Sequence, residues 1–160
     1  MTTREYNQSV ESFSDMVYRF LVKNTRNKDL SNDIIQDIYL KLWEKKKRVN
    51  FENSKSYLFK MAYNRMIDHY RKEKFEEQLD DYHLEDETNP NEFDTKKIIE
   101  NALNRLSKVQ KAVITLRDYE GYSYGEIGKI LNLNESQVKV YIYRGRKSLK
   151  QYLVSIENVI

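Results

Sequence analysis

The chain has 160 residues, of which 39% are hydrophobic and 33% charged, and its formal net charge at pH 7 is +3. It contains no cysteine, which excludes disulfides and thiolate metal sites, and its polar start and short apolar runs predict neither a signal peptide nor membrane insertion. We therefore expect a cytoplasmic protein of one ordinary domain or two small ones.

The charge is unevenly distributed along the chain. Residues 1–74 carry 16 basic and 10 acidic side chains, residues 75–95 carry nine acidic and no basic ones, and residues 96–160 carry 12 basic and six acidic ones. This pattern favours two basic domains, 1–74 and 96–160, joined by an acidic linker. Basic domains indicate contacts with a polyanion.

Helix breakers are scarce, with proline only at position 90 and glycine only at positions 121, 125, 128 and 145, so we expect an all-α fold. Apolar residues at helical spacing predict a first helix around Phe13, Met16, Val17, Phe20 and Leu21. The core stripe of a second helix, from about residue 31 to 46, comprises Ile34, Ile35, Ile38 and Leu42. A third helix is predicted from about residue 54 to 74.

The second helix also carries a different stripe. It contains Asp33, Gln36, Leu40 and Trp43, spaced three, four and three residues apart, with Asp37 beside them. A large apolar side chain among polar ones is typical of a partner-binding surface, because tryptophan is a common interface anchor. Periodicity alone leaves the alternative open that Trp43 belongs to the core.

The third helix and its approach form a candidate nucleic-acid surface. A basic run at 45–48 leads into residues 49–55, and the helix then alternates basic, aromatic and amide side chains. Such side chains can track phosphates and hold an unstacked base. A charge run by itself is more often a solvated face.

Residues 75–95 form the acidic segment, which we expect to be an extended or partly disordered linker; a plain solvated spacer fits its composition equally well. A short amphipathic helix should follow over about 98–106, and another over 109–116.

Residues 119–146 have the pattern of a DNA-reading helix-turn-helix. Ser123 can cap a short helix, with Glu126 completing a capping box, and 132–134 suit a tight turn. A second helix from Asn134 or Glu135 has an inward stripe of Val138, Ile142, Gly145 and Leu149. Its polar, cationic stripe comprises Gln137, Lys139, Tyr141, Arg144 and Lys147. A helix that enters a major groove requires this layout.

Three segments together resemble the extracytoplasmic-function, or group four, sigma factors of bacterial RNA polymerase. Residues 33–43 are similar to the region two motif that binds the largest polymerase subunit, residues 56–71 to the following helix that binds the minus-ten promoter element, and residues 106–153 to region four, which reads the minus-thirty-five element. The segments follow one another in the expected order. The resemblance implies a factor that directs core polymerase to promoters and captures a flipped base in the loop from Val49 to Ser54.

The resemblance also implies functional residues and partners. Core polymerase would contact Asp33, Gln36, Asp37, Leu40 and Trp43. The minus-ten DNA would contact Phe51, Asn53, Lys55, Lys60, Tyr63, Asn64, Asp68 and Arg71. The minus-thirty-five DNA would contact Glu135, Ser136, Gln137, Lys139, Val140, Tyr141, Arg144, Arg146 and Lys147. Expected partners are core RNA polymerase, promoter DNA and an anti-sigma factor. No catalytic residue, metal, cofactor or small-molecule substrate is expected.

Several positions depart from the family pattern. Ser107 and Lys108 stand where a Leu-Pro pair often begins region four, Gly128 replaces a usual alanine, and Val140 and Tyr141 replace a frequent Ser-Arg pair. The last change prevents transfer of a promoter sequence. The alternatives are a dimeric helix-turn-helix regulator that acts without polymerase, a metal-dependent nuclease that uses the acidic linker, and a helical protein-interaction module.

Overall fold

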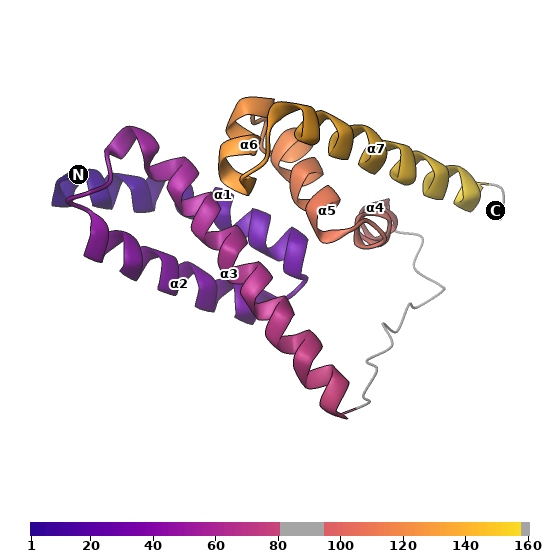
Figure 1. The fold of residues 1–160 in the computed structure, drawn as a ribbon, viewed down its shortest axis with the longest axis horizontal. Helices are drawn as coiled ribbons and strands as arrows, with labels where there is room; N and C mark the ends of the chain where they lie inside the picture. The colour runs from indigo at the N-terminus through magenta and orange to yellow at the C-terminus, as the bar shows by residue number, and fades with distance from the viewer. Residues whose placement is uncertain (81–94, 158–160) are drawn as a thin grey trace.

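The computed structural model describes the backbone of residues 1–80 and 95–157, with the side chains of 1–75 and 95–157. These residues form helices and short turns, which confirms the all-α prediction (Figure 1). The elements in chain order are α1 (Thr3–Thr25), α2 (Lys28–Lys45), α3 (Phe51–Asp80), α4 (Thr95–Asn104), α5 (Lys108–Ile114), the π-helical turn η1 (Thr115–Tyr119), α6 (Tyr124–Leu131) and α7 (Glu135–Glu157).

Helices α1 to α3 pack together as the N-terminal lobe, residues 1–80. The expected apolar stripes supply its core, because Phe20, Leu21, Ile38 and Leu42 are buried, as is Phe59 of α3. A capping box between Thr2 and Glu5 begins α1, and the Asn27 side chain accepts a hydrogen bond from Leu30 N at the start of α2.

Three expected helix boundaries in the N-terminal lobe differ in the structure. Helix α2 begins at Lys28, where Asn27 caps it, rather than at about residue 31. Helix α3 begins at Phe51 and reaches Asp80, so residues 75–80 of the expected linker are helical. Their glutamates, glutamine and leucine are good helix formers, and no proline or glycine interrupts them. Residues 81–94 of the expected linker lie outside the described residues.

Helices α4 to α7 form the C-terminal lobe, residues 95–157, and contain the expected helix-turn-helix as α6 and α7. The Ser123 hydroxyl accepts from Glu126 N at 3.1 Å, which is one half of the expected capping box. Asn132 ends α6 in the left-handed conformation at φ 57°. Two reciprocal hydrogen bonds then begin α7. Asn134 Oδ1 accepts from Gln137 N at 2.8 Å, and Gln137 Oε1 accepts from Asn134 N at 3.0 Å.

The two lobes pack against each other and share one hydrophobic core. Helix α3 packs against α6 (Figure 1), and α1 contacts both α5 and η1. The Phe59 ring of α3 contacts Phe20 on one side, with centroids 5.5 Å apart, and Tyr122 of the C-terminal lobe on the other, at 5.2 Å. This arrangement brings α3 beside the helix-turn-helix.

Candidate protein and nucleic-acid interfaces

The α2 outer face consists of Asp33, Gln36, Asp37, Leu40 and Trp43, all of which are exposed. Leu40 is 59% exposed and Trp43 41%, although both are large apolar side chains. The structure therefore rejects the alternative that Trp43 belongs to the core.

Neighbouring side chains hold the Trp43 ring in place on this face. Tyr6 of α1 meets it in a T-shaped contact with centroids 5.0 Å apart, and Lys46 Nζ lies 3.5 Å from the ring centroid. An exposed tryptophan that is supported in this way loses little conformational freedom when a partner covers it.

The α3 outer stripe contains five of the eight residues expected at the minus-ten DNA. They are exposed and lie on one side of α3, at spacings of seven, four, four and three: Asn53, Lys60, Asn64, Asp68 and Arg71. Two cations and two amides on one side of a helix can bind phosphates and base edges.

The other three residues expected at this DNA have different surroundings. Phe51 is half-buried against Phe13, with centroids 6.5 Å apart, and Lys55 Nζ lies 4.5 Å from the centroid of the Tyr122 ring. Tyr63 is half-buried, and this burial, together with the neighbouring Tyr141, raises the pKa of Tyr63. Lys55 and Tyr63 thus lie near residues of the C-terminal lobe.

The expected base-capturing loop from Val49 to Ser54 is mostly helical. Helix α3 already begins at Phe51, and both Val49 and Ser54 are buried. The Ser54 hydroxyl donates to Phe51 O at 2.6 Å, a local bond that a helix start allows. The exposed amides beside this first turn are Asn50 and Asn53.

Helix α7 exposes eight of the nine residues expected to read the minus-thirty-five DNA, and Tyr141 is half-buried. Val140 is 43% exposed. The Gln137 side chain accepts from Asn134 N, so the polar group expected to reach a base also caps the helix. Arg146 is bound to Asp118 of η1, at 2.6 and 3.3 Å, and this pairing raises the pKa of its guanidinium.

Sequence reasoning missed two residues that extend the basic side of α7. Tyr143, which is 68% exposed, and Lys150 line a surface hollow of about 650 Å³ together with Lys139 and Lys147. The sequence pattern could have identified them, because residues 139, 143, 147 and 150 recur at helical spacing. Tyr124 of α6 completes the hollow and has the Arg117 guanidinium 4.6 Å from its ring centroid.

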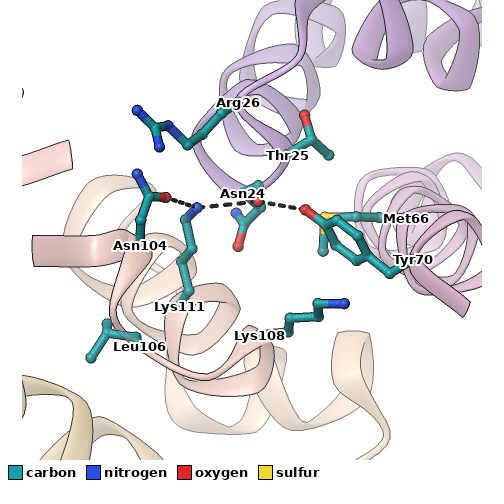
Figure 2. A pocket seen from close by; sticks show the side chains of 9 residues that line it. All are labelled: Asn24, Thr25, Arg26, Met66, Tyr70, Asn104, Leu106, Lys108 and Lys111. Carbon is teal, nitrogen blue, oxygen red and sulfur yellow. Dashed lines mark hydrogen bonds between the residues drawn. The ribbon is translucent and has the colours of Figure 1, made fainter. Parts of the chain in front are cut away.

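A buried polar cluster, which we call the Asn24 joint, connects the lobes (Figure 2). Asn24 O accepts from Tyr70 of α3 at 2.7 Å and from Lys111 Nζ of α5 at 3.2 Å, and Asn24 Nδ2 donates to Thr115 Oγ1 at 3.0 Å. Lys111 also donates to Asn104 Oδ1. Sequence patterns did not indicate this cluster.

The charge of Lys111 is disfavoured in this joint. Burial lowers its pKa to about 8, the neighbouring Arg26 lowers it as well, and Glu100 opposes the shift. The same surroundings raise the pKa of Tyr70 to about 12, chiefly through burial.

Metal clusters and membrane-spanning helices are absent from the part of the chain that the structure describes. Among the side chains of residues 1–75 and 95–157, no group of three or more metal-binding side chains comes together. In the same part of the chain, no helix has the length and apolar character needed to cross a membrane.

Comparison with known proteins identifies the family. Residues 9–76 match the model described as sigma-70 region 2, and residues 96–149 match the one described as sigma-70 region 4. The RNA polymerase sigma factor SigV of Bacillus subtilis is 30% identical over 135 residues, which cover 83% of this chain and 81% of SigV. The ECF RNA polymerase sigma factor SigM of the same organism is 25% identical over 146 residues, covering 88% and 90%. The chain belongs to the extracytoplasmic-function sigma factors of the sigma-70 family.

Solved structures of sigma factors have the same fold. The sigma factor RpoE of Bartonella quintana, in complex with the anti-sigma factor NepR, matches with a TM-score of 0.82 over 94% of this chain and 98% of RpoE at 24% identity. CnrH, in complex with the cytosolic domain of CnrY, matches with a TM-score of 0.73 over 96% and 90% at 20% identity.

This sigma factor is a non-catalytic RNA polymerase subunit that initiates transcription by binding core polymerase and promoter DNA. The alternatives of a polymerase-independent regulator, a nuclease and an interaction module are thereby rejected.

Proposed function

We propose that this sigma factor binds its partners through three separate surfaces. The α2 outer face binds core polymerase, the α3 outer stripe binds the minus-ten element, and the exposed side of α7 binds the minus-thirty-five element. Residues 1–74 and 96–160 then act as separate binding domains. The observation that carries the proposal is the exposure of Leu40 and Trp43 on a helix whose opposite side already fills the core.

The chemistry of the α2 outer face suits a protein partner. Leu40 and Trp43 offer apolar surface that binding would remove from water, and burial of such surface drives association. Asp33 and Asp37 lie beside them and would complement a basic partner surface. Lys46, whose ammonium group lies over the Trp43 ring, is a basic residue at the edge of this face.

The α3 outer stripe suits a partly opened duplex. Lys60 and Arg71 can bind phosphates, while Asn53 and Asn64 can donate to and accept from base edges. Asp68 is more suited to orienting a neighbouring cation or amide than to meeting a phosphate, because like charges repel. Such a stripe would hold an unpaired strand and so help melting.

The exposed side of α7 suits a major groove. Val140 presents an apolar side chain that can contact a thymine methyl group, and Arg144 lies four residues further along the same side. The flanking phosphates would be bound by Lys139 and Lys147, and by Tyr143 and Lys150, which line the same hollow.

An anti-sigma factor is a further expected partner. RpoE and CnrH, which share the fold, were solved with such inhibitors or their domains. We propose that a protein of this kind restrains the present chain as well, and that the chain acts in the cytoplasm, where core polymerase transcribes DNA.

The polymerase surface is tested by the double variant Leu40→Ala/Trp43→Ala. We expect it to weaken core polymerase binding by several kcal/mol, because interface hot spots contribute about 2 kcal/mol or more each. Lys41→Ala is the matched control, since Lys41 is exposed at the edge of the same face but is not one of the apolar anchors. Binding is measured by fluorescence anisotropy, and helix content by circular dichroism. Unchanged affinity in a folded double variant would reject this surface.

A further inference from the structure

Two side chains at the start of α1 determine the surroundings of the Trp43 ring. Tyr6 meets the ring directly, in a T-shaped contact with the centroids 5.0 Å apart and the planes at 73°. Thr3 acts through Lys46, because its hydroxyl accepts from Lys46 Nζ at 3.1 Å and the same Nζ lies 3.5 Å from the Trp43 ring centroid. Thr3 and Tyr6 are three residues apart and therefore lie on one face of α1. We call these four residues the Trp43 support.

The Tyr6 ring is itself fixed by contacts with α2. Its hydroxyl donates to Tyr39 O at 3.0 Å, and Tyr39 lies about one helical turn before Trp43. The two tyrosine rings also meet edge to face, with their centroids 6.4 Å apart. Tyr39 is buried, and its hydroxyl oxygen lies 3.0 Å from that of Ser14 on α1. Tyr6 cannot leave Trp43 without losing a hydrogen bond and its ring contacts.

The Trp43 support leaves the ring available to a partner. Trp43 stays 41% exposed, although Tyr6 lies against it and the Lys46 ammonium lies over it. Tyr6 and Lys46 are themselves half-buried. A side chain that is mobile in the free protein loses rotamer freedom when a partner covers it, whereas a ring already held in one orientation loses little. The geometry thus combines an accessible ring with a fixed one.

We propose that Tyr6 and Lys46 are positioning residues for polymerase binding: they act through Trp43, by holding its ring in the orientation that core polymerase binds. The inference rests on the proposed function of the α2 outer face. It adds α1 to the elements that determine polymerase affinity, although sequence patterns assigned α1 only to the core of the lobe.

The strength of the contacts allows this role to be separated from folding. Edge-to-face aromatic pairs and cations over an indole ring are favourable but individually weak at exposed positions. The core of the N-terminal lobe is built from other side chains, which include the fully buried Phe20 and Leu42. Loss of one contact to Trp43 should therefore loosen the ring without unfolding the lobe.

The motion of the ring can be measured directly. Trp43 is the only tryptophan in the chain, so time-resolved anisotropy of tryptophan fluorescence reports on this ring alone. In the wild type we expect the anisotropy to decay with the tumbling of the whole protein. Tyr6→Leu and Lys46→Met should each add a faster decay, because an unsupported exposed side chain changes rotamer within nanoseconds.

Polymerase affinity tests whether the orientation matters for binding. We expect Tyr6→Leu to weaken binding to core polymerase roughly threefold to tenfold, the range for ordering one further side chain on association. In a Trp43→Ala background, Tyr6→Leu should have no further effect, because the ring that it positions is gone. A residue with a merely structural role would weaken binding equally in both backgrounds.

Three variants serve as controls. Tyr6→Phe keeps the ring contact, so it should keep the slow anisotropy decay and most of the affinity. Tyr152→Leu removes a half-buried tyrosine of α7 that has the Arg105 guanidinium 4.0 Å from its ring centroid. Lys28→Met removes one exposed cation at the other end of α2. The last two should change neither the motion of the Trp43 ring nor polymerase affinity.

The possible outcomes are distinct. Unchanged ring motion in folded Tyr6→Leu and Lys46→Met would overturn the inference, as would wild-type affinity in a variant with a loosened ring. Equal losses with and without Trp43 would also overturn it. If circular dichroism shows that Tyr6→Leu does not fold, Lys46→Met is carried through the same measurements. Failure of the α2 outer face itself is distinguishable, because Leu40→Ala/Trp43→Ala would then also leave polymerase binding unchanged, and both proposals would be wrong.

Discussion

Lys111 is a buried cation, and its burial makes the stability of the protein depend on pH. Arg26, Tyr70, Lys108 and Glu100 are the titratable or charged groups around it, and its pKa is lowered from 10.5 to about 8. Above pH 8 the folded chain has released a proton that the unfolded chain still holds. The free energy of unfolding therefore gains a term that rises between about pH 8 and 10.5.

Lys111→Met should remove this rise while keeping the length of the side chain. We expect the difference in free energy of unfolding between wild type and Lys111→Met to shift in favour of the wild type as pH increases through this window. Urea denaturation at a series of pH values measures it, and the other lysines and tyrosines cancel in the difference. Parallel pH profiles for the two proteins would contradict the assignment.

Gln137 and Val140 are predicted to differ in how they read DNA. Val140 is exposed and apolar, whereas Gln137 would have to release Asn134 N before it could bind a base. We expect Val140→Ala to change the preferred base at one or two minus-thirty-five positions, since each wrong base costs about 1–3 kcal/mol.

Gln137→Glu should change the preferred base less than Val140→Ala does. Glutamate can also accept from Asn134 N in a capping box, so the side chain would stay at the start of the helix. Selection of binding sites from random DNA measures both effects. A preferred motif that is unchanged by Val140→Ala would show that this side of α7 does not enter the groove.

Single residues differed in how well the sequence predicted them. The spacing of Trp43 relative to Ile34, Ile38 and Leu42 assigned it to a stripe other than the core one, but left a core position open, and its exposure is known from the structure. The Asn24 joint was not predictable, because Asn24 and Thr115 are 91 positions apart and neither lies in a local pattern that requires a partner.

At the scale of elements, Gly128 shows how a departure from the family pattern fits the turn of the helix-turn-helix. A Cβ atom at this position would lie 2.5 Å from Leu133 O, a main-chain atom of the turn between α6 and α7. Glycine permits this close approach.

Gly128→Ala should therefore destabilise the protein by about 1–3 kcal/mol, the range for overpacking a tight site. The matched control is Gly125→Ala, where the added Cβ meets only the end of the flexible Glu135 side chain at 3.2 Å. That change should be neutral or stabilising, because alanine is the better helix former. Chemical denaturation compares the two, and equal stabilities would contradict the steric argument.

The sequence predicted the presence of helices in each lobe, but it predicted the residues at which they begin and end less well. Apolar spacing predicted α1, α2 and α7, because a stripe that faces a core must repeat at the helical period. The extension of α3 to Asp80 was missed because acidic composition was interpreted as a linker, although glutamate favours helices. The early start of α3 at Phe51 was missed as well. Most of the expected base-capturing loop is therefore the first turn of a helix.

For the whole molecule, the order of motifs predicted the family, while the packing of the lobes came from the structure. An apolar stripe shows that a helix must be covered but does not specify by what. Tyr122 was therefore not expected to pack against Phe59 of the other lobe. This packing changes the functional account, since the same tyrosine lies against Lys55.

Promoter-specific initiation by the whole molecule requires polymerase binding through the α2 outer face together with recognition of both promoter elements. The most direct measurement adds the purified protein to core RNA polymerase and its own genomic DNA and sequences the 5′ ends of the transcripts. We predict new start sites that share paired upstream motifs about 25 base pairs apart, the distance between the two elements, corresponding to about 85 Å. These starts should disappear with Leu40→Ala/Trp43→Ala and persist with Lys41→Ala. Start sites without shared motifs, or starts that survive the double variant, would contradict the account.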